Sequence, residues 1–417
     1  MNTSTKGAWL IHHARKLQAT TSQDFDAIGF AGRSGTLLSA ISASNQSHVS
    51  NKRLAALAKA NGISPKTEMP SILSELERQR LVALGADGIE VLGLTGKAIL
   101  EHTARIFSES DYEPHEDAAI IVAEIASERP TTTRSVSEYI SDTLKLSSQE
   151  TGTTLALAAN IGFFDTEPLS GDDSLVFNSN LFRRDDATKI SAIMSSLSGD
   201  ESRCLIEATQ KLQDSGCVPL DEITNILGKS LFSKLHSIAF FDVSAVGNDE
   251  GKRYFVTRPA AFSKFSNSIA DDAFDLAKAL VASLTYGMTV SSHQRGRIQA
   301  ISALMNKLIA GSSVGPATAI GSDYQALEQR GVVRVTPAER GMFTMKLLKP
   351  EVGRLALAVI ESGDASTEVV TALPGARVTL YATPESNREA ERKNVTEPLK
   401  RQTLKLLQDI RTGGLKR

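Results

Sequence analysis

The chain has 417 residues, of which 41% are hydrophobic, a share that is ample for several buried cores. Aromatic residues make up only 5%, which disfavours carbohydrate-binding grooves and the stacking platforms that hold single-stranded nucleic acid. The formal net charge of -2 excludes a uniformly basic nucleic-acid-binding protein, so any contact with DNA has to come from local basic patches.

Cysteine content and hydropathy favour a reduced protein without a membrane span. Cys204 and Cys217 are too few for a disulfide framework and too isolated for a zinc site, so we expect two reduced thiols. The apolar Trp9-Leu10-Ile11 is followed at once by histidines and basic residues, which is not the pattern of a signal peptide. No apolar run approaches the ~20 residues that span a bilayer. We expect a cytoplasmic protein with no membrane partner and no cofactor.

Residues 1–46 are predicted to form an N-terminal helical segment. Residues 7–18 place apolar side chains on one side of a helix, and a second helix is predicted from Thr36 to Ser44. Between them, residues 29–36 (GFAGRSGT) have the glycines of a phosphate-binding loop but lack the lysine before its terminal serine or threonine. We therefore interpret these residues as a turn before a helix.

One pattern occurs four times along the rest of the chain. An amphipathic helix is followed by a short apolar strand, a polar or glycine-containing turn and a second strand. The helix-to-strand junctions recur at roughly 80–90 residues, about the size of a small domain, and begin at Ser74, Leu157, Lys234 and Ala326. The predicted modules are residues 47–112, 113–185, 186–268 and 269–365, followed by a basic tail with a helix at 366–417.

The first module carries the clearest local signals. Ser50 is a predicted N-cap for a helix over residues 51–60, and Asn61-Gly62 is a helix stop. Ser64-Pro65 is expected to start the next helix, with proline in the first turn. Asp87-Gly88 between apolar runs predicts a hairpin, and Thr95 is the expected cap of a closing helix.

The second module is acidic at its third helix and hairpin, where the third and fourth modules carry basic residues. Its helices are predicted at 116–128, 135–144 and 148–160, and its hairpin strands at 163–165 and 174–177. The third helix has no lysine or arginine, and the hairpin turn contains Asp172 and Asp173. Because these carboxylates would repel phosphates, we expect this module to pack on a partner protein or on another module.

The last two modules carry basic residues on their third helices and hairpins. In the third, helices are predicted at 200–214, 220–227 and 229–237, and strands at 239–246 and 253–257. In the fourth, helices are predicted at 271–284, 295–310 and 317–329, with Gly315-Pro316 before the last one, and strands at 332–335 and 342–348.

This order of elements, clearest in the junctions from Leu76 to Val91 and from Leu327 to Met345, resembles that of winged helix-turn-helix proteins. The resemblance covers about three quarters of the chain and implies a mainly α fold with small β-hairpins (α+β), arranged as a tandem array of about four winged helix-turn-helix domains. In such proteins the third helix usually enters the major groove while the wing touches the backbone or the minor groove. The DNA-facing residues that the resemblance implies are Lys66, Arg78, Lys229, Lys234, Arg334, Arg340 and Lys346.

Local charge adds three further pairs of candidates for nucleic-acid contact. Basic residues on a wing and next to a recognition helix commonly clamp phosphates. The added candidates are Lys252 and Arg253 on the third wing, Arg295 and Arg297 in the fourth module, and Lys400 and Arg401 in the tail.

No arrangement of residues predicts catalysis or a metal site. His12-His13 has no carboxylate or cysteine at i+4, so we expect a surface or half-buried pair rather than metal ligands. The other histidines are scattered, and the acidic doublets fall at helix starts or in loops, where the helix dipole explains two of them. We therefore expect no catalytic residue and no metal.

These observations predict a non-enzymatic DNA-binding protein that acts on double-stranded DNA, as a transcriptional regulator or as the DNA-binding subunit of a larger assembly. The alternative is a protein-interaction scaffold, a subunit of a chromosome-organising or antiviral defence complex. The acidic second module and the near-neutral charge favour that alternative, with a partner subunit or a second copy of the chain as the ligand.

Overall fold

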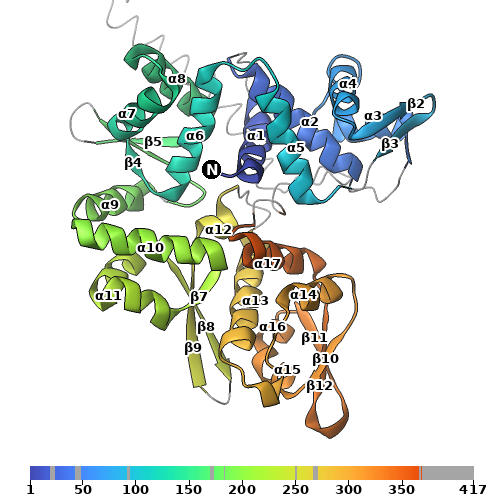
Figure 1. Ribbon diagram of the computed structural model, residues 1–417, viewed down its shortest axis with the longest axis vertical. Coiled ribbons are helices and arrows are strands. Elements are labelled where there is room, and N and C mark those ends of the chain that lie inside the picture. The colour runs from blue at the N-terminus through green and yellow to red at the C-terminus, as the bar shows by residue number, and fades with distance from the viewer. Residues whose placement is uncertain are drawn as a thin grey trace, which may run out of the picture. The chain divides into compact units, whose positions relative to one another are not determined.

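The structure is a computed structural model that describes residues 1–18, 24–42, 48–91, 94–169, 173–182, 184–248, 251–265, 271–365 and 368. The chain divides into two compact units, Met1–Ala376 and Arg377–Arg417, and all of the described residues lie in the first. This first unit is mainly helical with small antiparallel sheets of three strands, as the sequence predicts (Figure 1). In the part of the chain described, no helix is both long and apolar enough to cross a membrane.

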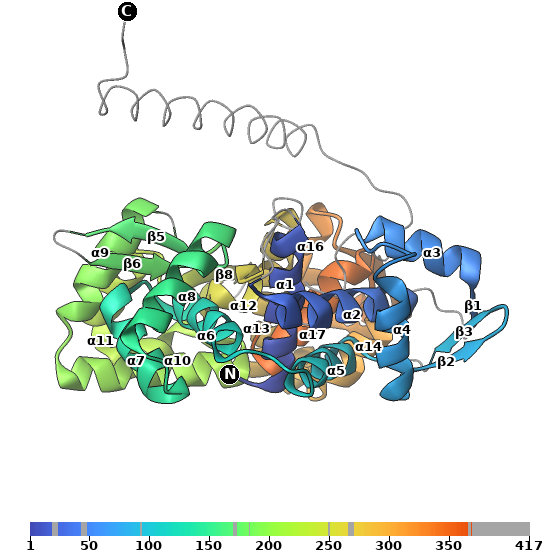
Figure 2. The same ribbon diagram turned by 90° about the horizontal axis from the view of Figure 1, so that it is seen from above.

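The N-terminal segment contributes two long helices to the interior of this unit. α1 (Thr3–Gln18) and α2 (Asp26–Ser42) pack against each other and against α5 (Gly96–Ser108), as Figure 2 shows. Most of their apolar side chains are fully buried. α2 consists mostly of apolar and small residues, which is the composition of a core helix, whereas α1 also carries Lys6, Arg15 and Lys16 beside its buried side chains.

Two glycines allow these helices to approach one another closely. A Cβ atom added at Gly7 would collide with the backbone of Leu100, and one at Gly32 would collide with the backbone of Leu10. The prediction of a turn over residues 29–36 is therefore wrong, because these residues lie inside α2. Glycine costs about 1 kcal/mol in a helix relative to alanine, but close packing of two backbones offsets that cost here.

Four antiparallel sheets follow in chain order, and all four have the same connectivity. In each sheet the third strand lies in the centre, paired with the first strand on one side and the second on the other. Two helices, or one helix with a kink, separate the first strand from the second. We number these units repeat 1 to repeat 4.

Repeats 1 and 2 occupy the N-terminal half of the unit. Repeat 1 consists of β1 (His48–Ser50), α3 (Asn51–Ala60), α4 (Met69–Arg78), β2 (Val82–Gly85) and β3 (Gly88–Val91). Repeat 2 consists of α6 (Pro114–Glu128), β4 (Thr131–Thr132), α7 (Thr133–Leu144), α8 (Ser148–Ile161), β5 (Asp165–Pro168) and β6 (Ser174–Phe177).

Repeats 3 and 4 occupy the C-terminal half. Repeat 3 consists of α9 (Arg184–Ser195), α10 (Gly199–Ser215), β7 (Cys217–Pro219), α11 (Leu220–Ser237), β8 (Asp242–Asn248) and β9 (Gly251–Thr257). The helices of repeat 4 are α12 (Ala260–Ser263), α13 (Asp271–Thr289), η1 (His293–Arg295), α14 (Ile301–Ile309), α15 (Thr318–Asp323), α16 (Gln325–Gln329), η2 (Glu339–Gly341) and α17 (Pro350–Ser362). Its strands are β10 (Val314–Ala317), β11 (Val333–Pro337) and β12 (Phe343–Leu347).

The capping signals at Ser50 and Thr95 and the turn signal at Asp87-Gly88 are confirmed. Ser50 accepts a hydrogen bond from the Arg53 N–H, and Thr95 accepts one from the Ala98 N–H, so both residues cap the helices that follow them. The hairpin predicted from Asp87-Gly88 joins β2 to β3. These signals are reliable because each one satisfies a backbone group that the helix or turn leaves without a partner.

Two predicted helix starts are wrong. α4 begins at Met69 instead of Ser64, because the N–H groups of Thr67 and Met69 both bond to Ser64 and hold the intervening residues in turns. The helix predicted over residues 295–310 begins only at Ile301, since Gly296 has a φ of 102° that interrupts the helical backbone.

Further differences lie at strands and in the fourth repeat. The helix predicted over residues 317–329 is divided at Tyr324 into α15 and α16, and Gly315-Pro316 lies in β10. In repeat 2 the first hairpin strand is Asp165–Pro168, because Phe163 and Phe164 are buried before the strand begins.

The first strand of each of these four sheets is not predicted by any pattern in the sequence. β1, β4, β7 and β10 are two to four residues long and pair along one edge only. An alternating pattern of apolar and polar residues needs at least four residues to be recognised, so strands of this length leave almost no signal.

Repeats 3 and 4 share an extensive contact. The β8–β9 hairpin lies against α13 and α15, and Lys278 on α13 pairs with Asp242 on β8 at 2.8 Å. α17, the last helix of repeat 4, packs against both α13 and α10 (Figure 1). The two repeats are therefore packed together, and α15 lies against the hairpins of both.

Candidate nucleic-acid interface

Repeat 3 exposes basic residues on its third helical segment. Gly228, with φ 74° and ψ 154°, kinks α11 and starts a new helical run over residues 229–237. Leu231, Phe232 and Leu235 are buried on the inner side of this run, which leaves Lys229 and Lys234 exposed. The separate helices predicted at 220–227 and 229–237 match this kinked pair.

The hairpin of repeat 3 adds two more exposed cations. Lys252 lies opposite Gly247 and Arg253 lies opposite Val246 in the β8–β9 ladder. Both side chains are exposed and make no ion pair with any residue that the structure describes. Lys234 also makes no ion pair with a described residue. Hydrogen bonds with Ser198 lower the pKa of the Glu201 carboxyl, and the nearby charge of Lys234 lowers that pKa further. Four cations of this repeat are accessible to an anion.

Repeat 4 places two like charges directly opposite each other. Arg334 on β11 and Lys346 on β12 are cross-strand partners, and both are exposed. Like charges in this position are destabilising by some tenths of a kcal/mol, unless solvent or an anion separates them. Arg340 occupies the left-handed region at the turn of the same hairpin, with φ 57°, and is also exposed. Glu339 is the acidic residue next to it.

Two of the predicted contact residues are bound to carboxylates instead. Arg295 donates from Nη2 to Asp323 Oδ1 at 2.8 Å, and the Asp323 side chain is only 1% exposed. Arg78 pairs with Glu75 and with Glu109, the latter at 2.6 Å, and these hydrogen bonds raise the pKa of the Arg78 guanidinium. Both guanidinium groups are already paired with carboxylates, so these arginines are poor candidates for phosphate contact.

The remaining predicted residues are exposed without belonging to a hairpin or third helix, or lie outside the described residues. Lys66 is exposed in the turn before α4, and Arg297 is exposed but donates from Nε to the Met288 carbonyl at 2.7 Å. Lys400 and Arg401 lie outside the described residues. Seven of the predicted cations are thus exposed on the third helical segment or the hairpins of repeats 3 and 4 and make no ion pair with a described residue: Lys229, Lys234, Lys252, Arg253, Arg334, Arg340 and Lys346.

Repeat 2 differs from its neighbours in charge and in packing. Its described hairpin strands carry Asp165 and Glu167 and no basic residue. Asn178, just after β6, donates from Nδ2 to the Lys264 carbonyl at 3.0 Å, and this bond joins the repeat to the segment after α12. A hairpin that carries two carboxylates and no cation on its described strands is not suited to a phosphate backbone.

Metal-ligating, thiol and imidazole groups were also predicted to be without a catalytic or ligand role, and the structure gives the surroundings of the described ones. The described residues contain no group of three or more His, Cys, Asp or Glu side chains that could hold a metal ion. Cys217 is buried, and burial raises the pKa of its thiol to about 12, so it is not a nucleophile near neutral pH. His13 is fully buried and His12 half-buried, and His13 stacks on Phe163 with ring centroids 3.9 Å apart.

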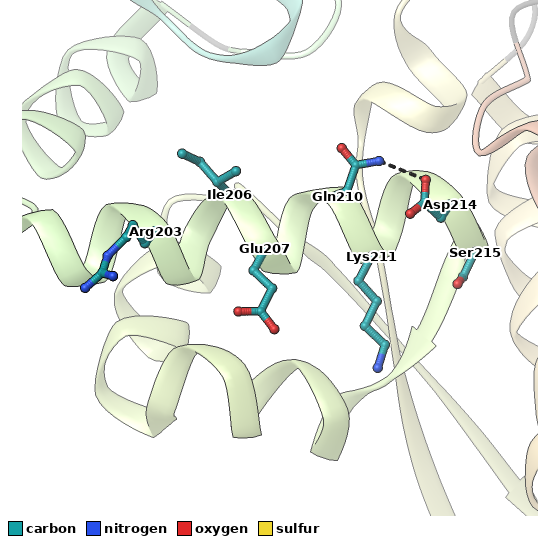
Figure 3. A pocket seen from close by; sticks show the side chains of 7 residues that line it. All are labelled: Arg203, Ile206, Glu207, Gln210, Lys211, Asp214 and Ser215. Atoms are coloured by element: carbon teal, nitrogen blue, oxygen red, sulfur yellow. Dashed lines mark hydrogen bonds between the residues drawn. The ribbon is translucent and has the colours of Figure 1, made fainter.

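A shallow hollow of about 570 Å³ follows the outer face of α10 (Figure 3). Glu207 and Lys211 point toward α11, where Lys211 pairs with Glu222, whereas Ile206 and Gln210 point away from it. Ile206 is 69% exposed, the highest fraction of any large apolar side chain among the described residues. No sequence signal singled out this face, because one isoleucine on an amphipathic helix looks like a core position.

No model of a known protein family matches this chain, and no curated protein matches it either.

Proposed function

We propose that this chain is a non-enzymatic DNA-binding protein with four tandem winged helix-turn-helix modules, and that repeats 3 and 4 contact double-stranded DNA. The order helix, strand, helix, helix, strand, strand in each repeat, with the third strand central, supports that modular interpretation. The DNA contact is supported most by the Arg334–Lys346 pair, because two exposed cations held face to face on a hairpin are a favourable place for a phosphate.

Charge distribution explains why the near-neutral chain is compatible with this function. Seven accessible cations lie on the third helical segment or the hairpins of repeats 3 and 4, which are the elements that a winged helix turns toward DNA. If all seven contact phosphates, the logarithm of the binding constant should fall with the logarithm of salt concentration with a slope of about -6.

The decisive experiment is fluorescence anisotropy with the full chain and a labelled random-sequence duplex, from low to physiological salt. Arg334→Gln/Lys346→Gln should weaken binding and make the slope less negative by about two. Arg203→Gln/Lys211→Gln on α10 is the matched control, since it removes the same charge from residues that are already paired with carboxylates. Equal loss in both variants, or binding that does not depend on salt, would refute the proposed interface.

Within a cell, such a protein acts as a transcriptional regulator or as the DNA-binding subunit of a larger assembly. The hollow on α10 favours a second function, that of an interaction scaffold in a chromosome-organising or antiviral defence complex. Exposed Ile206 in a hollow with paired charges has the apolar centre and polar rim of a small protein interface. If a second copy of the chain binds there, Ile206→Asp should convert a dimer to a monomer in light scattering; a wild-type monomer at all concentrations would leave only a different subunit as partner.

A further inference from the structure

The β8–β9 hairpin has one packed face and one open face near its turn. Val246 on β8 is buried, whereas Ala245 and Gly247 on either side of it are exposed. Because successive residues of a strand point to opposite faces, Val246 marks the face that packs on the rest of the chain. Ala245 and Gly247 lie on the other face, which we call the open face.

The open face also carries Lys252 and Tyr254 on β9. Lys252 is the ladder partner of Gly247, and Tyr254 is the partner of Ala245, so each pair shares a face. Alanine and glycine are too small to cover the side chains opposite them. Tyr254 is 47% exposed, and its hydroxyl makes no hydrogen bond with any residue that the structure describes. A hydroxyl donor and an ammonium group are thus uncovered on the same face.

The third helical segment of α11 packs on the same side of the hairpin. Val243 and Val256 are cross-strand partners nearer the base of the hairpin, and by alternation they belong to the open face as well. Both pack in one hydrophobic cluster with Leu231 and Leu235 of the helical segment. The basic helical segment and the open face are therefore both available to one extended ligand.

The spacing of residues on the open face suits a phosphate backbone. Residues two positions apart on a strand are separated by about 7 Å, which is close to the separation of neighbouring phosphates along one DNA strand. A lysine ammonium and a tyrosine hydroxyl both donate hydrogen bonds to phosphate oxygens in protein–DNA complexes. Asp249 and Glu250, which stand between the two strands in the sequence, would repel phosphates. A backbone contact is therefore expected on the open face and not at the turn.

We propose that Lys252 and Tyr254 bind two neighbouring phosphates of one DNA strand, Lys252 through its charge and Tyr254 through its hydroxyl. This inference rests on the proposed function and adds to it an uncharged contact, which a search for basic residues does not detect. A hydrogen bond to an anionic oxygen is strong and directional, so Tyr254 fixes the position of the hairpin along the backbone.

The test compares Tyr254→Phe with the wild type, using the full chain, a labelled random-sequence duplex and fluorescence anisotropy at several salt concentrations. The variant should bind about tenfold more weakly, since it lacks a hydrogen bond to a charged group, and its salt slope should stay the same because no charge is removed. Tyr139→Phe is the matched control and should bind like the wild type, because it removes a hydroxyl from a similarly exposed tyrosine on α7 in repeat 2.

The outcomes separate this inference from the proposed function. Equal affinity of Tyr254→Phe and the wild type would show that the hydroxyl does not contact a phosphate, and would overturn this assignment alone. A wild-type chain without salt-dependent binding to the duplex would refute the proposed function and, with it, this inference.

A second pair of variants tests the open face without changing Tyr254. Ala245→Glu adds a carboxylate opposite Tyr254 and should weaken binding at least tenfold, because the added charge repels the phosphates. Thr166→Glu adds the same charge at an exposed strand position of repeat 2 and should leave the affinity unchanged. Circular dichroism verifies that both variants fold. Equal affinity of the two variants would show that DNA does not contact the open face, and the inference would be wrong.

Discussion

At the scale of single residues, Trp9 donates its indole N–H to Glu124 at 2.7 Å, and Glu124 also pairs with Lys264 at 2.9 Å. These three side chains join α1, α6 and the segment after α12. Burial raises the pKa of the Glu124 carboxyl, but Lys264 and the Trp9 hydrogen bond outweigh burial and hold that pKa below its ordinary value. The carboxylate is thus charged, largely desolvated and dependent on its partners.

Removing only the cation should therefore be costly. Lys264→Met leaves the Glu124 charge without its main partner, and we expect it to lower the free energy of unfolding by about 3–5 kcal/mol. Urea denaturation followed by Trp9 fluorescence measures this change. The double variant Lys264→Met/Glu124→Gln removes both charges and should recover part of the loss; a single variant as stable as the wild type would show that the pair does not bear on stability.

The buried histidine pair makes stability depend on pH. Burial lowers the pKa of His13 well below its ordinary value of 6.5, and His12 and Lys16 lower it further. Because the folded-state pKa is below the unfolded-state pKa, the unfolded chain binds protons first as the pH falls. The stability that neutral His13 provides is fully present above pH 6.5 and decreases below it.

His13→Phe should keep the stacking on Phe163 and remove this proton uptake. Between pH 6.5 and 5 the melting temperature of the wild type should fall more steeply than that of the variant. The comparison is made by calorimetry at matched ionic strength. Parallel pH profiles would assign the acid sensitivity to other groups.

At this scale the sequence predicts which cations are exposed on a hairpin better than it predicts which cations pair with a distant carboxylate. Exposure of Lys252, Arg334 and Lys346 follows from their place on short strands. The pairing of Arg295 with Asp323 could not be foreseen, because these two residues are 28 positions apart in the chain and no local pattern links them. Tertiary partners of this kind decide whether a cation faces solvent or a carboxylate.

At the scale of elements, some glycines inside helices are required by close packing and others are not. Gly32 in α2 lies against the backbone of α1, whereas Gly152 in α8 has no atom within 4 Å of an added Cβ. Long helices with recognisable caps were predictable because capping is local. The burial of the N-terminal helices was not predictable, because their close contact depends on residues far away in the chain.

These two glycines provide a matched pair of substitutions. Gly32→Ala should destabilise the protein by about 1–3 kcal/mol, since the backbones of α1 and α2 have to move apart. Gly152→Ala should stabilise it by about 0.5–1 kcal/mol, because alanine has the higher helix propensity and the site is open. Chemical denaturation reports both values; a Gly32→Ala variant with wild-type stability would contradict the close packing.

At the scale of the whole molecule, the hairpins of repeats 3 and 4 share α15 as their support, and α13 adds further contacts with the hairpin of repeat 3. Asn248 near the end of β8 donates to Tyr286 Oη and to Asp323 Oδ1, both at 2.8 Å, so the first hairpin is fastened to the second repeat. The four repeats and their order were predictable from the recurrence of helix and hairpin. Their mutual packing was not, because it depends on side chains that carry no periodic signal.

Shared support leads to a prediction about combined charge changes. Lys252→Gln/Arg253→Gln and Arg334→Gln/Lys346→Gln should each make the salt slope of DNA binding less negative by about two, and together by about four. Anisotropy titrations at several salt concentrations give these slopes. If only one pair changes the slope, the DNA contacts one repeat and the other serves a different ligand.

The contact between α17 and α10 also bears on the order in which the chain acquires its structure during synthesis. A Cβ added at Gly216 would collide with the backbone of Val359, and one at Gly363 with the backbone of Gln213, so the end of α10 and the end of α17 interlock. When the ribosome has just completed β9, every element of repeat 3 has been synthesised, but α17, which packs against α10, has not. A stop codon ahead of Pro350 would remove α17 and thus destabilise repeat 3, although repeat 3 is encoded entirely upstream of that codon.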